Sequence, residues 1–279
     1  MRTKLFCLLL CGVGLLFALS ARAAESTRTP GRILAAKVHG NVIALNKADN
    51  SRKELHDSDA LSEGYVITTA EKSSVVLIFA NGAAVNLGEN SSLSIDEFLM
   101  DPFDPKYSVA DAKDEPSTSV TSLSLARGEL VGNVKHLHRD NGSSFLINTP
   151  VGAAGIRGTT FSLVLHTDRN GKVTLTLSTS EGLVVLTDLD GTEHLIPAGK
   201  QIEIGFDTFS NDPSGRTGIV PGSIRISGIA DLPAETQAAI ARAVEQILAT
   251  RRVSFDTFGA PNATQPPVMT TPGDGQGGR

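Results

Sequence analysis

The sequence contains no tryptophan and only two cysteines, Cys7 and Cys11, among its 279 residues. Both cysteines lie in the N-terminal hydrophobic segment, so the rest of the chain has no thiol. Their absence there excludes disulfide cross-links, thiolate metal sites and cysteine nucleophiles from that part. The lack of tryptophan removes the aromatic platform on which sugar rings most often stack. Stability must therefore come from a packed apolar core.

Basic residues are also scarce, with 25 lysines and arginines against 30 aspartates and glutamates, a formal net charge of −5. Nucleic acid binding depends on clusters of lysine and arginine at phosphates, and this chain has no such cluster. It also lacks the polybasic patch that holds proteins on anionic lipid. We therefore expect neither nucleic acid nor a charged lipid surface as a partner.

Long apolar runs are missing except at the N-terminus. There, Arg2 and Lys4 precede the apolar residues 5–19, and small residues follow up to Ala23. This order predicts a signal peptide over residues 1–23, cleaved after Ala23, with an uncleaved anchor as the alternative. The run is shorter than the roughly 20 apolar residues that a membrane-spanning helix needs. We therefore expect a periplasmic or extracellular protein with no transmembrane span after signal removal.

Short runs of alternating apolar and β-branched residues fill residues 31–205. Hairpin-type turn signals separate them, at Asn81-Gly82, Asn141-Gly142, Asn170-Gly171 and Asp190-Gly191. Many short strands at close spacing predict an all-β domain, either a sandwich, a barrel or a coiled β-solenoid. A weak repeat of Gly-x-apolar units, beginning at Gly40 and again at Gly182, favours the solenoid.

Three further segments complete the expected organisation. Residues 99–118 carry two Asp-Pro pairs and several acids, which predicts a solvated loop insertion, with a partner-docking lid as the alternative. Residues 206–230 are expected to form an extended linker. Residues 231–252 place Ile240, Val244, Ile247 and Leu248 on one side, which predicts a C-terminal helix. Residues 259–279 are rich in proline, threonine and glycine and are expected to be disordered.

The most distinctive stretch is residues 149–161, a tight corner shaped by glycines that leads directly into a strand. Pro150 cannot donate a backbone hydrogen bond, and three glycines follow it at a spacing of three residues. Arg157 is the only charged residue of the corner. The candidate structural or binding residues are Thr149, Pro150, Gly152, Gly155, Arg157, Gly158, Thr159 and Phe161.

The order Thr-Pro-x-Gly-x-x-Gly-x-Arg-Gly-Thr-x-Phe resembles the signature of the FecR domain, a bacterial periplasmic module. The later segments Glu181-Gly182-Leu183-Val184 and Ile196-Pro197-Ala198-Gly199 fit the same order, so the resemblance covers residues 31–205. It implies a twisted, solenoid-like β-domain, with a β-sandwich as the alternative. Family members of the regulator type pass an external signal to a cytoplasmic sigma factor through a transmembrane helix. This chain departs from that order, because a cleavable signal stands where the cytoplasmic segment and helix would be.

Arg157 has two interpretations. Its guanidinium has five donors in a rigid fork, which we expect to satisfy carbonyl groups left free by the glycine corner. The alternative is an anchor for a carboxylate or carbonyl group of a partner.

Catalytic and metal-binding patterns are missing. His136 and His138 could share a metal on one face of a strand, but Lys135 and Arg139 flank them, so a solvated polar segment is the better interpretation. No Gly-x-Ser-x-Gly elbow and no phosphate-binding loop occur. We therefore expect no catalytic residues, no metal and no cofactor. The sequence predicts an exported, non-enzymatic binding or signalling module of the cell envelope with a protein partner. The alternative is a structural or adhesive envelope scaffold.

Overall fold

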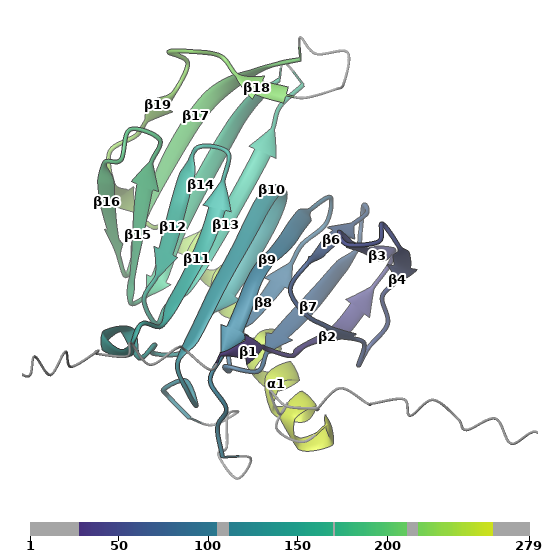
Figure 1. Cartoon of the computed structure of the whole chain (residues 1–279). Helices are drawn as coiled ribbons and strands as arrows, with labels where there is room; N and C mark the ends of the chain where they lie inside the picture. Colours follow the sequence, from purple (N-terminus) through teal and green to yellow (C-terminus); the bar gives the residue numbers. More distant parts are fainter. Residues whose placement is uncertain (1–27, 105–111, 170, 211–216, 259–279) are drawn as a thin grey trace, which may run out of the picture.

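The computed structural model describes residues 28–104, 112–169, 171–210 and 217–258. These residues form mainly β-strands, with one α-helix at the C-terminal end and a short 3-10 helix, Arg139–Asn141 (Figure 1). The signal peptide predicted over residues 1–23 and the tail expected at 259–279 lie outside the described residues. No helix in the described part is both long and apolar enough to cross a membrane.

The strands form two rows, here called sheet A and sheet B. Sheet A runs in the order β4 (Arg52–Glu54), β3 (Val42–Asn46), β6 (Tyr65–Thr69), β9 (Ser92–Met100), the first half of β10 (Ser119–Asn133), β11 (Ser144–Thr149), β12 (Gly152–Ile156), β15 (Leu183–Asp188) and β16 (Glu193–Pro197). A short strand, β1 (Thr29–Pro30), pairs with the end of β9. All of these pairs are antiparallel except β10 with β11.

Sheet B is antiparallel throughout. Its order is β5 (Ala60–Leu61), β2 (Ile33–His39), β7 (Ser74–Phe79), β8 (Ala84–Leu87), the second half of β10, β13 (Thr160–Thr167), β14 (Lys172–Glu181) and β17 (Lys200–Ser210). The far side of β17 pairs with β18 (Thr217–Ile219), β19 (Arg225–Ile226) and β20 (Ala230–Asp231). The segment expected as a linker, 206–230, thus contains the end of β17 together with β18 and β19.

The long strand β10 belongs to both sheets and bends between them. Its pairing with β9 is irregular between Leu125 and Arg127, and Gly128 then adopts a φ of 92°. A side chain at Gly128 would also collide with Ser91, so this position needs glycine. Since the two rows of described strands share only β10, the sheet is not closed into a barrel.

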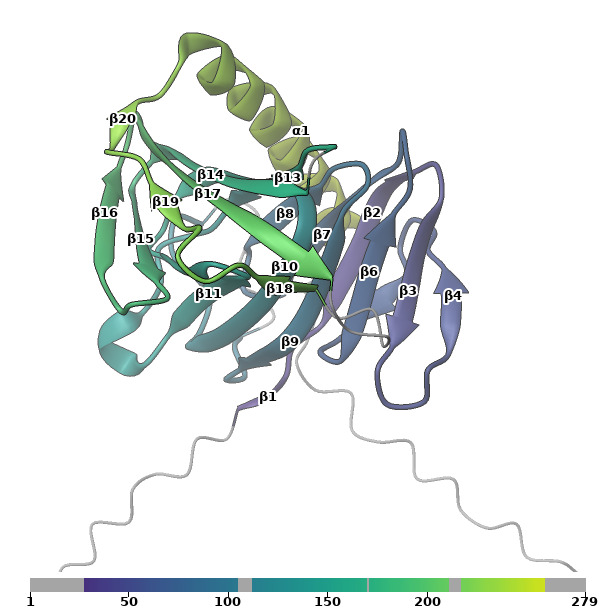
Figure 2. The same ribbon diagram turned by 90° about the horizontal axis from the view of Figure 1, so that it is seen from above.

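The two sheets face each other across one core (Figure 2). The alternating apolar residues expected on the strands supply it, for example Phe161, Leu163 and Leu165 of β13. Phe79 packs edge-to-face on Phe98 and Phe145, with ring centroids 5.1 and 6.2 Å apart. The chain passes repeatedly from one sheet to the other as it adds strands. The expected all-β architecture with a single C-terminal helix is confirmed.

The helix α1 (Ala234–Phe258) packs on the outer face of sheet B, as Figure 2 shows. Ile240 and Ile247 are buried there against a second apolar cluster that includes Val76 and Ile78. Before the helix, the Lys200 ammonium donates to the Asp231 carboxylate at 2.6 Å. Leu248, expected on the same apolar stripe, remains 42% exposed and contributes to the site described below.

Of the segment expected as a solvated insertion, 99–118, residues 105–111 lie outside the described residues, and the parts on either side of them differ from the expectation. Leu99 and Met100 complete β9, and Phe103 packs against the core. At the other end, Glu115 is only 1% exposed. The local charge predicted solvent exposure, but hydrogen-bond donors brought by distant segments allow this carboxylate to be buried.

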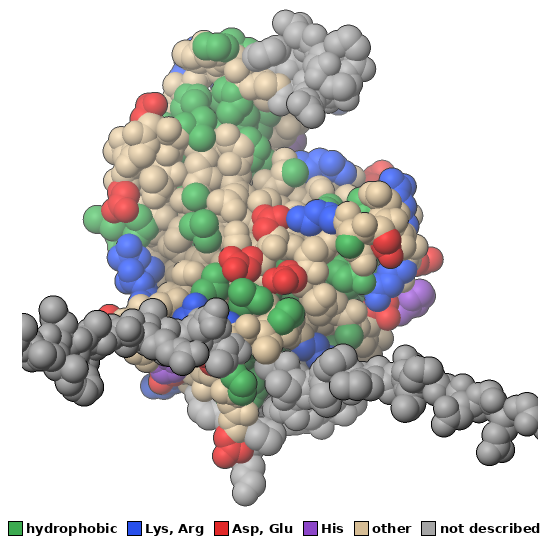
Figure 3. Space-filling model, in the orientation of Figure 1, with side chains coloured by type: hydrophobic (Ala, Val, Ile, Leu, Met, Phe, Trp, Pro, Cys, Tyr) green, Lys and Arg blue, Asp and Glu red, His purple; other side chains and the backbone are tan. Residues whose placement is uncertain are grey.

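The outer face of sheet A carries many uncharged polar side chains with a few charged groups among them (Figure 3). Asp96 accepts hydrogen bonds there from Ser124 at 2.5 Å, Ser94 at 2.7 Å and Lys47 at 2.9 Å. Burial alone would raise the pKa of the Asp96 carboxyl, but hydrogen bonds from Ser124, Lys47 and Ser94 outweigh it and lower the pKa.

This lowered pKa predicts a pH dependence of stability. The Asp96 carboxylate stabilises the fold above its unfolded-state pKa of about 3.9, and the contribution is lost as the pH falls through the lower folded-state pKa. As the pH falls below about 5, the free energy of unfolding should decrease less for Asp96→Asn than for the parent protein. The difference should be under about 1 kcal/mol, because the site is partly solvated. Urea unfolding at several pH values measures this difference. Parallel pH profiles for the two proteins would contradict it.

Candidate functional site

The corner at residues 149–161 crosses from sheet A to sheet B. Thr149 ends β11, and Pro150 lies in the turn that follows. The Thr149 hydroxyl donates to the Gly152 carbonyl at 2.8 Å and closes this turn. Residues 152–156 then form β12, between β11 and β15, and residues 157–159 lead into β13 of sheet B. The sequence predicted no strand at 152–156, because glycine and alanine have little β-propensity.

Two of the three glycines are required by their backbone geometry. Gly158 adopts a φ of 66°, and a Cβ there would lie 2.5 Å from His136 Cδ2 and 3.1 Å from His136 Cα. Gly152 has a φ of 149°, and a Cβ would collide with the Thr187 carbonyl. Gly155, in contrast, has no such φ, and its Cβ would make an ordinary contact with the Val185 carbonyl at 3.6 Å. The corner therefore depends on Gly152 and Gly158 rather than on all three glycines.

Arg157 follows β12 and is half-buried. Its guanidinium makes no hydrogen bond or ion pair with any residue that the structure describes. We expected this guanidinium to donate to carbonyl groups of the glycine corner. Among the described residues, no carbonyl group accepts a hydrogen bond from it.

From this geometry, we expect Arg157→Ala to change the free energy of unfolding by less than about 0.5 kcal/mol. Thermal unfolding of the variant beside the parent protein measures this. A loss of about 1–3 kcal/mol would instead show that the guanidinium satisfies buried carbonyl groups in solution.

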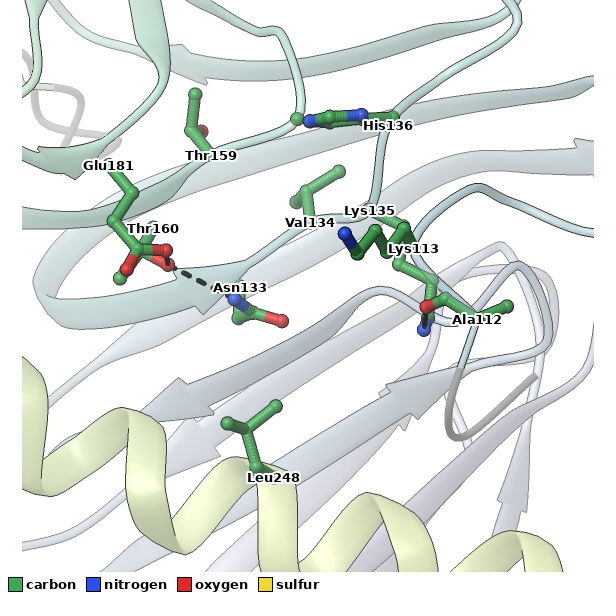
Figure 4. A pocket seen from close by; sticks show the side chains of 11 residues that line it. Ala112, Lys113, Asn133, Val134, Lys135, His136, Thr159, Thr160, Glu181 and Leu248 are labelled. Carbon is green, nitrogen blue, oxygen red and sulfur yellow. Dashed lines mark hydrogen bonds between the residues drawn. The ribbon is translucent and has the colours of Figure 1, made fainter. Parts of the chain in front are cut away.

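An open cavity of about 270 Å³ lies beside the corner (Figure 4). Its walls come from five parts of the chain: the segment before β10, the end of β10 and the residues after it, the corner, the end of β14, and α1. The lining residues are Ala112, Lys113, Asn133, Val134, Lys135, His136, Gly158, Thr159, Thr160, Glu181 and Leu248. Gly158 and Thr159 of the sequence motif therefore lie in the wall of a cavity.

One wall is a chain of hydrogen bonds. The Asn133 amide donates to the Thr160 hydroxyl at 3.0 Å (Figure 4), and this hydroxyl donates to Glu181 Oε2 at 3.1 Å. The other carboxylate oxygen of Glu181 has no partner in the described part of the chain. Thr159, only 2% exposed, has a buried hydroxyl that lacks a partner in the same part. These oxygens leave hydrogen-bonding capacity unused at and beneath the wall.

Positive charge lies on the opposite side. The Lys113 side chain is exposed, and its ammonium has no hydrogen-bond or ion-pair partner among the described residues. Lys135 is buried and donates to the Ala112 carbonyl. Leu248 adds an apolar contact from α1. The cavity can therefore hold a ligand that combines an acidic group, a hydrogen-bond donor and a small apolar portion.

The buried carboxylate of Glu115 fixes the segment that bears Lys113. Glu115 Oε1 accepts from the His138 backbone N–H at 2.7 Å, and Oε2 accepts from the Ser119 hydroxyl at 2.5 Å. The Asn81 amide in turn donates to the Ser119 hydroxyl at 3.0 Å. The backbone of Glu115 also donates to the His136 carbonyl at 3.0 Å. Glu115 thus connects the cavity wall to the end of the core.

The two histidines do not point to one site. The His136 ring lies 3.6 Å from an Asp114 carboxylate oxygen and is mostly exposed, whereas His138 Nε2 lies 3.0 Å from the Glu115 carbonyl. Among the described residues, no group of three histidine, cysteine, aspartate or glutamate side chains is arranged to hold a metal ion.

Sequence reasoning missed most of this cavity. It singled out Gly158 and Thr159, and it considered His136 as a metal ligand or, preferably, as part of a solvated polar segment. Lys113 and Glu181 are ordinary surface charges in the sequence, and Leu248 belongs to a helical stripe. Thr160 stands between Thr159 and Phe161 in the motif, and Glu181 begins the later segment 181–184 of the same resemblance, but neither was singled out as a site residue.

The comparisons agree with the motif. Residues 65–185 match the family model described as FecR protein. The chain is a FecR-domain protein. The matched part runs from β6 to β15 and includes the corner, the shared strand β10 and most of the cavity wall. The family assignment made from the motif is confirmed. No curated protein matches the chain.

Two crystal structures are similar to this chain, at 2.50 and 1.65 Å resolution, and both are of a "putative anti-sigma factor" from Parabacteroides distasonis ATCC 8503. Each is 13% identical to this chain and superposes with a TM-score of 0.39. The matches cover 62% of this chain and 62% and 63% of the two solved chains. The chain thus matches less than two thirds of that protein's length.

Proposed function

We propose that this FecR-domain protein is an exported, non-enzymatic module that binds a protein partner in the cell envelope and serves regulation through that contact. The observation that carries the proposal is the placement of the family motif in the wall of an open cavity. Two charged groups face this cavity from segments distant in the sequence: Lys113, which has no partner among the described residues, and Glu181, whose second carboxylate oxygen has none there. Such exposed charged groups cost little in water and gain most when a binding partner satisfies them.

The chemistry of the walls indicates the kind of contact. An acidic group of the partner fits Lys113, and a backbone or side-chain N–H fits the free oxygen of Glu181. Arg157, which follows β12 and whose guanidinium has no partner among the described residues, would extend the cationic surface of the same corner. A short polar segment of a protein combines these groups.

In-cell photo-crosslinking tests the proposal. The full chain carries a photoreactive amino acid at position 113, beside the cavity, or at position 190, in the exposed turn after β15. We expect one protein to be captured from position 113, with the yield reduced by Glu181→Lys and no capture of that protein from position 190. Equal capture from both positions, or a yield that Glu181→Lys leaves unchanged, would refute a partner at this cavity. Capture of envelope polymer alone would favour the scaffold alternative.

Export is a separate prediction. Because residues 1–23 have a charged start, an apolar centre and small residues at the end, the envelope form of the protein should begin at Ala24. N-terminal sequencing or intact-mass measurement of protein from the envelope fraction checks this. A protein that retains Met1 would show that the segment is not removed.

A further inference from the structure

The two edges of sheet A differ in how they are protected. At one end β4 has three charged residues, Arg52, Lys53 and Glu54. At the other end lies β16 (Figure 1), which has the sequence Glu-His-Leu-Ile-Pro. Its central Leu195 is 54% exposed. Edge strands present unpaired backbone groups, and charged side chains are a common protection against pairing with another chain. β4 has this protection along its whole length, whereas β16 has only Glu193 at one end and Pro197 at the other, with the exposed Leu195 between them.

The pairing of β15 with β16 shows which backbone groups of β16 point outward. The Asp188 N–H donates to the Thr192 carbonyl, and the Ala198 N–H donates to the Gly182 carbonyl. Hydrogen-bonded pairs alternate along an antiparallel ladder, so His194 and Ile196 also point their backbone groups toward β15. Glu193, Leu195 and Pro197 therefore point outward. They leave two N–H donors and three carbonyl acceptors without a partner in the described part of the chain, because proline has no N–H.

Exposed apolar side chains gather around this edge. The five exposed large hydrophobic residues of the described part are Leu189, Leu195, Ile226, Ile229 and Leu248. Two of them belong to the β15–β16 hairpin and two to the segment of β19 and β20, which Figures 1 and 2 both draw beside β16. Figure 3 shows hydrophobic side chains on the same margin of the molecule. We call β16 with these four residues the apolar edge.

We propose that the apolar edge pairs with the same edge of a second copy of this chain. In this arrangement the two β16 strands lie antiparallel around a two-fold axis at Leu195 and extend sheet A across both copies. Leu195 of each copy exchanges two backbone hydrogen bonds with its counterpart, and each Glu193 N–H donates to the Pro197 carbonyl of the other copy. The missing N–H of Pro197 leaves only the Glu193 carbonyl unpaired at each end.

The charges favour a second copy over a parallel or shifted arrangement. With Leu195 opposite Leu195, Glu193 stands opposite Pro197 and not opposite another acid. No like charges stand opposite each other between the two β16 strands, and the leucines stack on each other at the two-fold axis. Strands of five residues bury a small area, so the pairing should be reversible and depend on concentration.

Light scattering coupled to gel filtration tests the proposal on the full chain. The parent protein should approach the mass of two copies as its concentration rises, and Leu195→Lys should stay at the mass of one copy with an unchanged melting temperature. The matched control is Lys53→Leu on β4, which should not alter the parent's behaviour. A parent protein that is monomeric at all concentrations would overturn the proposal and leave the edge to an extended segment of another protein. A dimer that persists in Leu195→Lys would also overturn it.

A cysteine variant decides the register and keeps the test independent of how the lysine variant folds. Leu195→Cys should form a covalent dimer under mild oxidation, because paired residues at the two-fold axis have a Cα separation of about 5.5 Å, which a disulfide spans. The controls are the parent protein, which has only Cys7 and Cys11, and Lys53→Cys on the other edge. Cross-linking of Leu195→Cys at the rate of Lys53→Cys would exclude this pairing.

Discussion

Replacing Gly158 by alanine should destabilise the fold by about 2–5 kcal/mol, the sum of left-handed backbone strain of about 1–2 kcal/mol and overpacking of about 1–3 kcal/mol. The strain arises because Gly158 has a φ of 66°, where a Cβ approaches the following carbonyl oxygen. The overpacking arises because the added methyl would lie 3.1 Å from His136 Cα, a backbone atom that cannot rotate away. Urea-induced unfolding of the variant and of the parent protein measures the total loss.

Gly155→Ala is the matched control, because Gly155 lies in the same motif three residues away. Its φ is not in the left-handed region, and the added Cβ would stand 3.6 Å from the Val185 carbonyl. We expect no loss, or a gain of up to about 1 kcal/mol from the reduced entropy of the unfolded chain. Equal losses in the two variants would mean that the motif depends on glycine in general rather than on one left-handed residue in contact with His136.

Removing the Glu115 carboxylate should have the other large effect. Glu115→Ala leaves the His138 N–H and the Ser119 hydroxyl without their acceptor in a buried site, at a cost of about 2–4 kcal/mol. It should also release the segment before β10, because Glu115 is its buried contact with the core. We therefore expect faster cleavage by protease between residues 112 and 118, together with the lower stability.

Two further variants make this test specific. Glu115→Gln keeps an acceptor for His138 but disturbs the Ser119 contact, so it should lie between the parent protein and Glu115→Ala. Glu71→Ala removes a glutamate whose side chain is 75% exposed, and it should change stability by less than about 0.5 kcal/mol. A Glu115→Ala protein as stable as the Glu71→Ala protein would show that the buried carboxylate contributes nothing.

The cavity predicts a link between these stability effects and binding. Glu115 anchors the wall that bears Lys113, and Gly158 contacts His136 in another wall. Glu115→Ala and Gly158→Ala should therefore weaken capture of the partner from position 113. Because Arg157→Ala should leave stability nearly unchanged, a change in capture by that variant would report on binding alone. The pairing of β16 lies at the far edge of sheet A, so Leu195→Lys should leave capture from position 113 intact.

The sequence by itself determined the class of fold and the family. Alternating apolar residues such as Phe161, Leu163 and Leu165 can bury one face only as strands, so local periodicity was sufficient for an all-β prediction. The helical stripe with Ile240 and Ile247 was sufficient for the C-terminal helix for the same reason. The motif at 149–161 identified the FecR domain because its residues are contiguous.

Only the tertiary structure decided the rest, because it depends on contacts between residues far apart in the chain. Periodicity predicts which apolar residues face the core. It does not predict that the two sheets share β10, because that depends on the bend of this strand at Gly128. The charge of Glu115 predicted solvent exposure. Its carboxylate can be buried because the His138 N–H and the Ser119 hydroxyl donate hydrogen bonds to it. Likewise, Lys113 and Glu181 form one cavity because sheet pairing and the buried Glu115 bring their segments together, which no local pattern encodes.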